Sequence, residues 1–269
     1  MEIDGRVAVI TGGGGGIGGA IAQLLAAGGA KVVLADLDGG AATAVADSIN
    51  GQAPGSAIAA EADVTDSAAL KTLIAAAEDA FGPVDMFFAN AGIGGGGGIA
   101  SEDEWAAALG VNLMAHIRAA RLLVPGWLER GQGYFVSTAS AAGLLTQIGL
   151  APYAVTKHAA VGFAEWMAVT YGARGIRVSC LCPMGVDTNL LNSGLEIEGD
   201  QGVGAKVVAD AGRILSPEEA AEAVLEAIAA ERFLILPHPE VLDFYRFKGS
   251  DYDRWIGGMQ RLQARIEAS

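Results

Sequence analysis

The stretch Thr11-Gly12-Gly13-Gly14-Gly15-Gly16-Ile17-Gly18 decides the fold of this chain. It follows the apolar run Arg6 to Ile10, which predicts a strand, and it leads into residues 17–25, whose apolar side chains have helical spacing. Glycines in this position let the backbone turn and approach a pyrophosphate, and the start of a helix supplies N–H groups and a favourable dipole. A glycine run alone is typical of a flexible linker. The strand before it and the helix after it favour a dinucleotide-binding loop.

Short apolar runs alternate with longer helical patterns along the rest of the chain. This alternation predicts a parallel sheet with helices on both faces, and strands without polar alternation fit burial on both sides. No linker divides the sequence, so we predict one α/β domain over residues 1–269. The expected strands are Arg6 to Ile10, Lys31 to Ala35, Ser56 to Ala60, Val84 to Ala89, Gly133 to Ser137, Ile176 to Leu181 and Arg232 to Leu236.

Composition and charge exclude several classes of protein. The 269 residues are 52% hydrophobic and 18% charged, which is ample for a buried core and too apolar for disorder. The formal net charge is -14 with no basic run, so nucleic acid and anionic membranes are poor candidates as partners. The uncharged stretch Val7 to Ala30 contains nine glycines and follows Glu2 and Asp4 rather than a positive flank, which argues against a membrane span. We expect a soluble cytoplasmic protein.

Cysteine and histidine usage indicates neither disulfides nor a metal site. Cys180 and Cys182 lie two apart in an apolar run, so they share one face of a strand and fit small core residues in a reducing compartment. The three histidines, His116, His158 and His238, have no clustered partners in the sequence. We therefore expect no metal.

A carboxylate follows the second expected strand. Asp36 lies twenty residues after Gly16, the distance at which a carboxylate can accept hydrogen bonds from the adenosine ribose. It would also repel a 2′-phosphate, and no Arg or Lys occupies the glycine loop or follows Asp36, where Leu37 stands. Both arguments predict NAD rather than NADP. Asp38 competes for this role, but we interpret it as the N-cap of the next helix.

The sequence Tyr153-Ala154-Val155-Thr156-Lys157 places a phenol and an ammonium four residues apart, on one face of a helix. The ammonium would favour the ionised phenol, whose unperturbed pKa is about 10. A tyrosine whose pKa is shifted toward neutrality can act as a general acid or base. Because the same spacing occurs by chance on many solvated helices, the pair gains meaning only from its neighbours.

Those neighbours are Thr11-Gly12-x-x-x-Gly16-x-Gly18, Asn90-Ala91-Gly92 and Ser140, which precedes Tyr153 by thirteen residues. In order and spacing these motifs resemble the short-chain dehydrogenase/reductase family in its single-domain form, from about Arg6 to Leu236. The resemblance implies a three-layer, doubly wound Rossmann fold. The expected cofactor-binding residues are Gly12, Gly16, Ile17, Gly18, Asp36, Leu37, Asp63, Val64, Asn90, Ala91, Gly92, Tyr153, Lys157, Pro183, Val186 and Thr188.

The resemblance also implies a catalytic tetrad of Asn112, Ser140, Tyr153 and Lys157. Residues of these types can oxidise an alcohol if Tyr153 takes its proton while hydride leaves for a nicotinamide. Lys157 would lower the pKa of the phenol together with the positive nicotinamide ring, and would hold the nicotinamide ribose. Ser140 would hold the substrate oxygen. Asn112 would hold a water molecule, or it is simply a polar residue of a helix. Asp63 has two interpretations as well: a contact to the adenine, or a turn residue.

One departure from the family pattern concerns the substrate. The family usually has Pro-Gly after the sixth strand, whereas this chain has Pro183-Met184, so Met184 narrows or lines the pocket. Thr188 keeps its distance from Pro183 and is expected at the nicotinamide carboxamide. No Arg or Lys stands near, so we expect an apolar alicyclic, aromatic or steroid-like alcohol. The expected substrate-lining residues are Ser140, Gln147, Tyr153, Met184, Leu190 and Leu191, with Leu144, Leu145, Ile148 and Leu195 nearby.

Two segments and the assembly complete the expectations. Residues 187–212 lack a clear period and predict a lid or binding loop, and the aromatic residues of the tail, 237–269, suggest packing against a neighbour. Apolar positions in 105–128 and 151–171 predict a homo-oligomer, a dimer or tetramer. The alternative functions are an NADPH-linked ketone or 3-oxoacyl reductase and, outside enzymes, a redox-sensing dinucleotide-binding module. A nucleotide-sugar epimerase would need more chain than follows Leu236.

Overall fold

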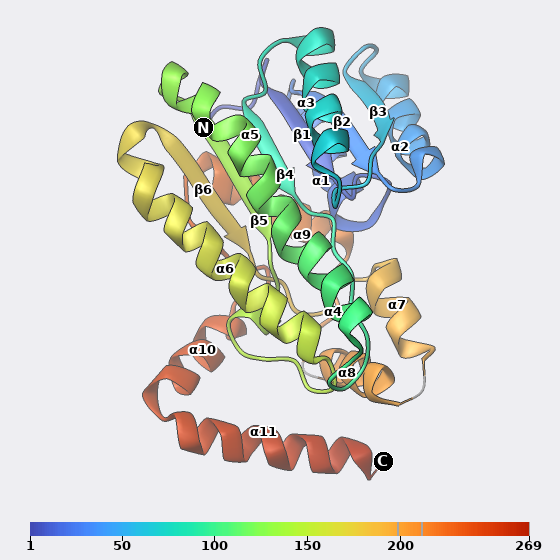
Figure 1. The fold of residues 1–269 in the computed structure, drawn as a ribbon, viewed down its shortest axis with the longest axis vertical. Coiled ribbons are helices and arrows are strands. Elements are labelled where there is room, and N and C mark those ends of the chain that lie inside the picture. The colour runs from blue at the N-terminus through green and yellow to red at the C-terminus, as the bar shows by residue number, and fades with distance from the viewer. Residues whose placement is uncertain (198, 211, 269) are drawn as a thin grey trace.

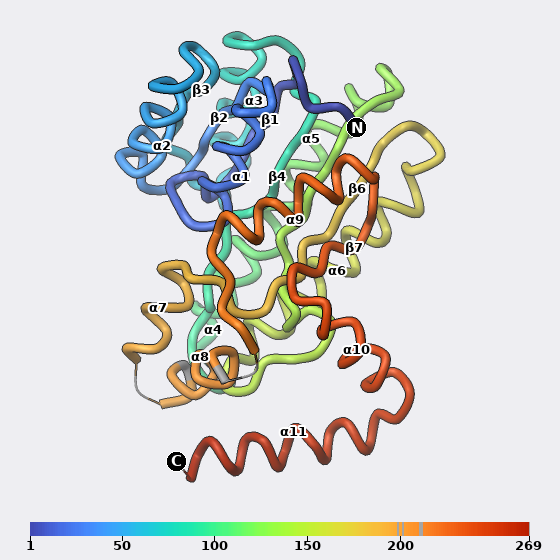
Figure 2. The backbone as a smooth tube through the Cα atoms, turned by 180° about the vertical axis from the view of Figure 1, so that it is seen from behind, coloured from blue at the N-terminus to red at the C-terminus, as the bar shows by residue number. Residues whose placement is uncertain are grey.

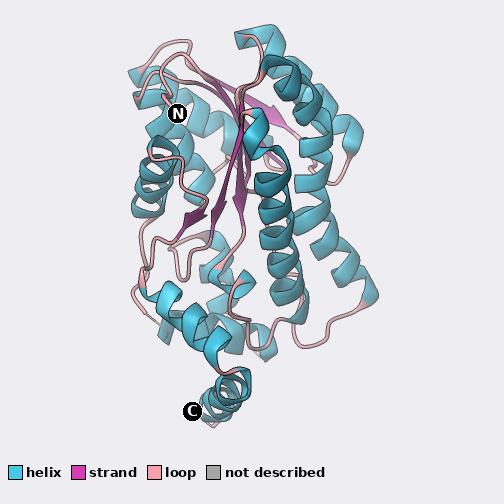
Figure 3. Cartoon of the chain, turned by 90° about the vertical axis from the view of Figure 1, so that its left-hand side faces the viewer, coloured by secondary structure: helices cyan, strands magenta, loops and turns pink. Residues whose placement is uncertain are grey.

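The computed structural model describes residues 1–197, 199–210 and 212–268. A seven-stranded parallel sheet lies between two layers of helices (Figure 1, Figure 3), which confirms the predicted α/β fold, a doubly wound sheet of the Rossmann type. The strand order is β3-β2-β1-β4-β5-β6-β7, so the order reverses between β1 and β4. The strands are β1 Val7–Thr11, β2 Lys31–Asp36, β3 Ala57–Glu61, β4 Met86–Ala89, β5 Gly133–Thr138, β6 Ile176–Leu181 and β7 Leu234–Ile235.

The two faces of the sheet have separate cores because alternate residues of each strand point in opposite directions. In β1, Val9 packs with the helices α3, α5 and α6, whereas Ile10 packs with α1, α2 and α9. The principal helices are α1 Gly16–Ala27, α2 Gly39–Gln52, α3 Ser67–Phe81, α4 Glu102–Leu109, α5 Ala115–Arg130, α6 Ala151–Tyr171, α7 Asn189–Leu195, α8 Asp200–Asp210, α9 Pro217–Ala229, α10 Glu240–Ser250 and α11 Tyr252–Glu267. Shorter turns are the π-helix η1 Gly110–Met114 and the 3-10 helices η2 Ala141–Gly143 and η3 Gly172–Arg174.

One helical run is long and apolar enough to cross a membrane, among the residues described: Glu102–Arg130, which comprises α4, η1 and α5. Its buried side chains include Ala119, Leu123 and Trp127, which belong to the core on one face of the sheet. That packing accounts for the apolar composition of the run.

The lid segment differs from the sequence expectation. Residues 187–212, expected to be a loop without a period, contain the helices α7 and α8. The tail also forms two helices, α10 and α11. All four helices lie beyond the carboxyl edge of the sheet (Figure 1, Figure 2), at the end where open α/β sheets bind ligands.

Candidate active site

The glycine loop forms the floor of a cleft at the reversal of strand order. Gly12 and Gly16 have positive φ angles of 64° and 52°, which glycine adopts without strain. A Cβ atom at Gly18 would lie 2.2 Å from the carbonyl oxygen of Gly12 and 2.5 Å from the Asn90 side chain. Only glycine therefore permits the close contact between the start of α1 and the loop, and the N–H groups of that helix start remain directed at the cleft.

Asn90 ties the loop to the neighbouring strands. Its Nδ2 donates to the carbonyl oxygens of Thr11 at 3.1 Å and of Gly12 at 3.3 Å, and its Oδ1 accepts from the Thr138 hydroxyl at 3.1 Å. One amide thus holds the ends of β1, β4 and β5 in register at the cleft. Ala91 and Gly92, which follow Asn90, line the same cleft.

The carboxylates after β2 have different roles. Asp36 lines the cleft, where its Oδ2 accepts the Gly14 N–H at 2.9 Å. Asp38 also lines the cleft, but its Oδ1 accepts the Ala41 N–H at 3.0 Å and it is the N-cap of α2, which confirms the capping interpretation. Leu37 is 71% exposed and does not line the cleft.

Asp63 and Val64 lie outside the cleft lining. Asp63 accepts the Thr65 N–H at 2.8 Å, and hydrogen bonds with Thr65 hold the pKa of its carboxyl below the usual value. Val64 is buried in the core. The structure therefore places Asp63 in the turn that the sequence left as an alternative, and it brings neither residue to the cavity.

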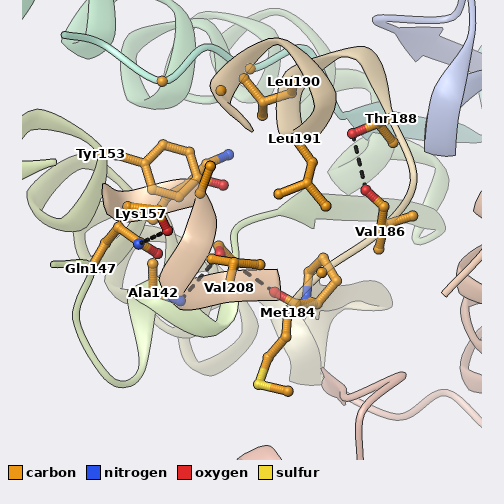
Figure 4. Close-up of a pocket in the computed structure, with 18 of the residues that line it drawn as sticks. Ala142, Gln147, Tyr153, Lys157, Met184, Val186, Thr188, Leu190, Leu191 and Val208 are labelled. Carbon is orange, nitrogen blue, oxygen red and sulfur yellow. Dashed lines mark hydrogen bonds between the residues drawn. The ribbon is translucent and has the colours of Figure 1, made fainter. Parts of the chain in front are cut away.

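Ser140, Tyr153 and Lys157 all line the cleft, and Figure 4 shows Tyr153 and Lys157 side by side. Ser140 follows β5, and its Oγ accepts the Ala142 N–H at 3.1 Å and donates to the Pro183 carbonyl at 3.4 Å. Tyr153 and Lys157 lie on α6, and the Lys157 Nζ is 5.6 Å from the centroid of the Tyr153 ring. The strand end supplies the hydroxyl, and the helix supplies the phenol and the ammonium.

The electrostatics of the pair differ from the sequence expectation. Burial raises the pKa of Tyr153, while its hydrogen bond with Ser140 acts in the opposite direction. Burial also lowers the pKa of Lys157 to about 8, and its Nζ donates to the Thr138 carbonyl at 2.9 Å. In the absence of a cofactor, desolvation therefore outweighs the hydrogen bond with Ser140, and the expected depression of the phenol pKa is not present.

Asn112 lies behind this group, fully buried in the π-helix between α4 and α5. It forms hydrogen bonds with Ile93 and Thr156 and does not line the cavity. A Cβ atom at Gly92 would lie 3.3 Å from the Lys157 Nζ and 3.5 Å from the Asn112 Oδ1. Gly92 thus leaves the space between the amide and the ammonium free of side chain.

The lid helices cover the cleft from the other side. Thr188 begins α7, and its Cγ2 would lie 3.2 Å from a Cβ atom at Gly16, so the lid approaches the glycine loop. Hydrogen bonds join Asp187 N to Leu215 O at 2.9 Å and Leu215 N to Gly185 O at 3.0 Å, which pins the two ends of the lid together. The cavity is also lined by three residues that the sequence predicted as cofactor contacts, Pro183, Val186 and Thr188.

The cavity has a volume of about 1130 Å³. Met184, Leu190 and Leu191 line it (Figure 4), and Gln147 lines it while donating from Nε2 to the Gly204 carbonyl of α8 at 2.9 Å. Leu144, Ile148 and Leu195, expected nearby, do not line it. Further lining residues on the lid and the tail were not predicted from the sequence: Ile197, Val207, Val208, Phe244, Trp255, Met259 and Leu262. For the last three, on α11, the helical spacing was the available signal.

His238 has a structural role that the sequence did not predict. Its Nε2 lies 2.9 Å from the Arg213 carbonyl, which only a protonated nitrogen can satisfy, so Nδ1 accepts the Met184 N–H at 3.2 Å. The imidazole thereby fixes the backbone of Met184 between the lid and the tail. No cluster of three or more His, Cys, Asp or Glu side chains suited to a metal occurs within the described part of the chain.

These features define an α/β protein with a dinucleotide cleft: a glycine cradle at a helix start, a carboxylate after β2, and a serine, tyrosine and lysine group at the far end. The comparisons agree. Residues 6–197 match the family model described as short chain dehydrogenase, and the chain therefore belongs to the short-chain dehydrogenase/reductase family.

Individual relatives differ in their named substrates. The chain is 35% identical over 246 residues to a 1-deoxy-11-beta-hydroxypentalenate dehydrogenase of Streptomyces avermitilis, covering 89% of this chain and 87% of that protein. It is 31% identical over 226 residues to the 3-oxoacyl-[acyl-carrier-protein] reductase of Vibrio cholerae, covering 83% and 90%. A crystal structure of a family member from Burkholderia phymatum in complex with NAD superimposes with a TM-score of 0.85 at 34% identity, covering 94% and 96% of the two chains.

Proposed function

We propose that this protein is an NAD-dependent oxidoreductase that interconverts a secondary alcohol and a ketone. The observation that carries the proposal is the convergence of Ser140, Tyr153 and Lys157 at the end of a cleft whose other end is a glycine cradle with Asp36. The proton-transfer group and the dinucleotide-binding loop thus line one cavity. The balanced reaction is alcohol plus NAD⁺ giving ketone, NADH and a proton.

The residues of this chain manage the proton and the position of the substrate. Tyr153, as phenolate, takes the hydroxyl proton, and Ser140 holds the same oxygen through its hydroxyl. Lys157, buried beside the phenol, favours the phenolate when it carries its charge, and holds the nicotinamide ribose. When bound, NAD supplies the acceptor for the hydride that leaves the alcohol carbon. In reduction Tyr153 returns the proton.

The preference for NAD rests on charge. Asp36 lies on the cleft at the end of β2, and its carboxylate would accept hydrogen bonds from ribose hydroxyls but repel a 2′-phosphate. Leu37, which follows it, offers no positive charge. The cradle at Gly12 and Gly16 fits a pyrophosphate, because a methyl group there would fill the space or strain the backbone.

The substrate side favours an apolar alicyclic, aromatic or steroid-like alcohol. Leu190, Leu191 and Met184 line it, and neither Arg nor Lys other than Lys157 contributes to the cavity among the described residues. An apolar wall without a cation disfavours carboxylates and phosphates. The Streptomyces relative, named for a hydroxypentalenate, is consistent with an alicyclic substrate.

A panel of alicyclic, aromatic and steroid alcohols, followed by nicotinamide absorbance with NAD and with NADP, tests this proposal. Turnover restricted to acyl thioesters or anionic sugars would contradict the substrate class. Activity with NADPH and 3-oxoacyl substrates would instead support the second candidate, a reductase, which the Vibrio cholerae relative favours. A redox-sensing binding module would bind NADH and turn over none of the panel.

The surroundings of the protein are also proposals. We expect a homo-oligomer, since α6 exposes Trp166 at 53% and Val169 at 85% on its outer face. Sedimentation separates monomer, dimer and tetramer. We expect a cytoplasmic location and no nucleic acid or membrane partner, given the acidic charge of -14.

A further inference from the structure

The two C-terminal helices close the outer side of the substrate cavity. Helix α11 runs beyond the carboxyl edge of the sheet (Figure 1, Figure 2), and Trp255, Met259 and Leu262 recur on one of its faces. All three line the cavity that contains Tyr153. The far wall of this cavity is therefore built by a segment outside residues 6–197, the part that matches the family model.

Packing alone holds α11 weakly. None of its described residues is fully buried. A second cavity, of about 750 Å³, lies between α11 and the loop 145–151, and it shares Trp255 and Met259 with the substrate cavity. Because α11 has space on two sides, its position must depend on contacts made elsewhere.

One buried ammonium provides such a contact. Lys248, near the end of α10, is 7% exposed, and its Nζ donates to the carbonyl oxygens of Leu144 at 2.8 Å and Leu145 at 2.7 Å. Nζ also lies 3.4 Å from Nε2 of His158, whose Nδ1 is 2.8 Å from the Ala154 carbonyl. The proton between Nδ1 and that carbonyl belongs to the imidazole, so Nε2 is an acceptor for Lys248.

The ammonium joins three parts of the molecule. Leu144 and Leu145 follow η2, the turn that Ser140 begins, and lead to Gln147 of the substrate cavity. His158 follows Lys157 on α6, and the Tyr252 ring at the start of α11 lies 5.5 Å from Nζ. No carboxylate forms an ion pair with Lys248 among the described residues.

A charge buried without a counterion is costly unless hydrogen bonds replace its water. An aliphatic side chain would pack in the same place at no such cost, but it could not bind two carbonyl groups. The position of Lys248 is therefore explained by what it holds in place.

We propose that Lys248 is a positioning residue that fixes α10 and α11 as the outer wall of the substrate cavity, and that Trp255, Met259 and Leu262 bind the part of an extended apolar substrate farthest from Tyr153. The anchoring half of this proposal is independent of the proposed function. The substrate half rests on it.

Hydrogen exchange of the substrate-free protein tests the anchor. Lys248→Met keeps the length of the side chain and removes the donor, and Lys71→Met, at an exposed site on α3, is the matched control. We expect amides of residues 240–267 to exchange at least roughly tenfold faster in K248M, the equivalent of about one lost hydrogen bond to a charged group, with β1 and α1 unchanged. Equal protection of this segment in K248M and K71M overturns the anchoring role.

Substrate selection is tested with a small and an extended alcohol, cyclohexanol and a steroid alcohol. Trp255→Ala should lower kcat/KM for the steroid by roughly tenfold, mainly through KM, and lower kcat/KM for cyclohexanol by a clearly smaller factor, with partial recovery in Trp255→Phe. Equal losses on both alcohols overturn the selective role. If the native protein oxidises neither, the proposed function and the substrate half fail together, while hydrogen exchange still decides the anchor.

Discussion

Asn112 and the backbone of Ile93 are joined by a reciprocal pair of hydrogen bonds. Asn112 Oδ1 accepts the Ile93 N–H, and its Nδ2 donates to the Ile93 carbonyl, each at 2.9 Å. Nδ2 also donates to the Thr156 hydroxyl at 3.1 Å, on the residue before Lys157. One buried amide therefore connects the loop after β4, the π-helix and the catalytic face of α6, and its Oδ1 keeps one lone pair for the expected water.

Replacing this amide should destabilise the protein. Asn112→Ala leaves the N–H and carbonyl of Ile93 without this partner in a partly buried place, so we expect the free energy of unfolding to fall by about 2 to 4 kcal/mol. Urea unfolding measures it. Asn112→Asp loses the donors and places a carboxyl group at a fully buried site against the Ile93 carbonyl, so it should lose at least as much stability as Asn112→Ala. A loss below about 1 kcal/mol in both variants would show that the amide is not structural.

The contact between Gly18 and Gly12 predicts a strict requirement for glycine. Gly18→Ala would place a methyl group 2.2 Å from the Gly12 carbonyl, so the loop must move. We expect a loss of about 2 kcal/mol of stability and a weaker affinity for NADH, measured by its fluorescence. Gly51→Ala is the control, because it lies in α2 with no atom within 4 Å of the new Cβ and should be neutral or stabilising.

Much of the fold could be predicted because the central strands of the sheet are buried on both faces. A continuous apolar run such as Lys31 to Ala35 has few other interpretations, and the structure gives β2 as Lys31–Asp36. Ser140 could be placed at the ligand-binding edge because it follows a strand and parallel strands end together, whereas the family resemblance implied its meeting with Tyr153 and Lys157. Asp63 could not be placed, because a carboxylate after a strand serves equally well as a turn residue, and that is where the structure has it.

The lid and the tail could not be folded from their sequence, because their positions depend on distant contacts. Helix α8 is held by the Gln147 amide at the Gly204 carbonyl, and a Cβ atom at Gly149 would lie 2.3 Å from the Asp200 carbonyl. Neither contact leaves a periodic pattern. The direction of the Tyr153 pKa likewise depends on burial, which the spacing of Tyr153 and Lys157 does not specify.

Asp36 should determine cofactor choice. In Asp36→Ser/Leu37→Arg the repulsion of a 2′-phosphate is replaced by attraction, so the ratio of kcat/KM for NADP to that for NAD should rise by about a hundredfold or more. Asp38→Ser is the matched control, because serine also caps a helix and Asp38 serves as the cap of α2. If Asp38→Ser changed the ratio and the double variant did not, the two carboxylates would have to exchange roles.

The hydroxyl of Tyr153 should matter far more for turnover than for cofactor binding. Tyr153→Phe removes the hydroxyl and keeps the ring, so kcat for alcohol oxidation should fall by about 10² to 10⁴, with the Kd for NADH within about twofold. Since burial raises the pKa of Tyr153, oxidation by the native protein should accelerate as pH rises through the alkaline range. Stopped-flow traces across pH check both. If Tyr153→Phe turned over alcohol as fast as the native protein, Tyr153 would have no part in the mechanism.

The buried ammonium of Lys157 should give the cofactor-free protein a characteristic dependence of stability on pH. Its pKa is lowered by burial from 10.5 to about 8, so the unfolded chain binds the proton more tightly than the folded protein. Where the unfolded state holds more protons, stability increases with pH. This contribution therefore disfavours folding below pH 8 and is relieved as pH rises from 8 toward 10.5.

Lys157→Met, which has no proton to lose, isolates this effect. The difference in unfolding free energy, native minus variant, should become more favourable to the native protein by roughly 2 kcal/mol between pH 8 and pH 10, because each unit of pKa difference corresponds to about 1.4 kcal/mol. Titrating groups that do not interact with Lys157 cancel in the difference, so chemical denaturation at several pH values measures it. A flat difference would mean that Lys157 keeps its ordinary pKa in the folded protein, and its close hydrogen bond to Thr138 would then have to offset the whole cost of burial.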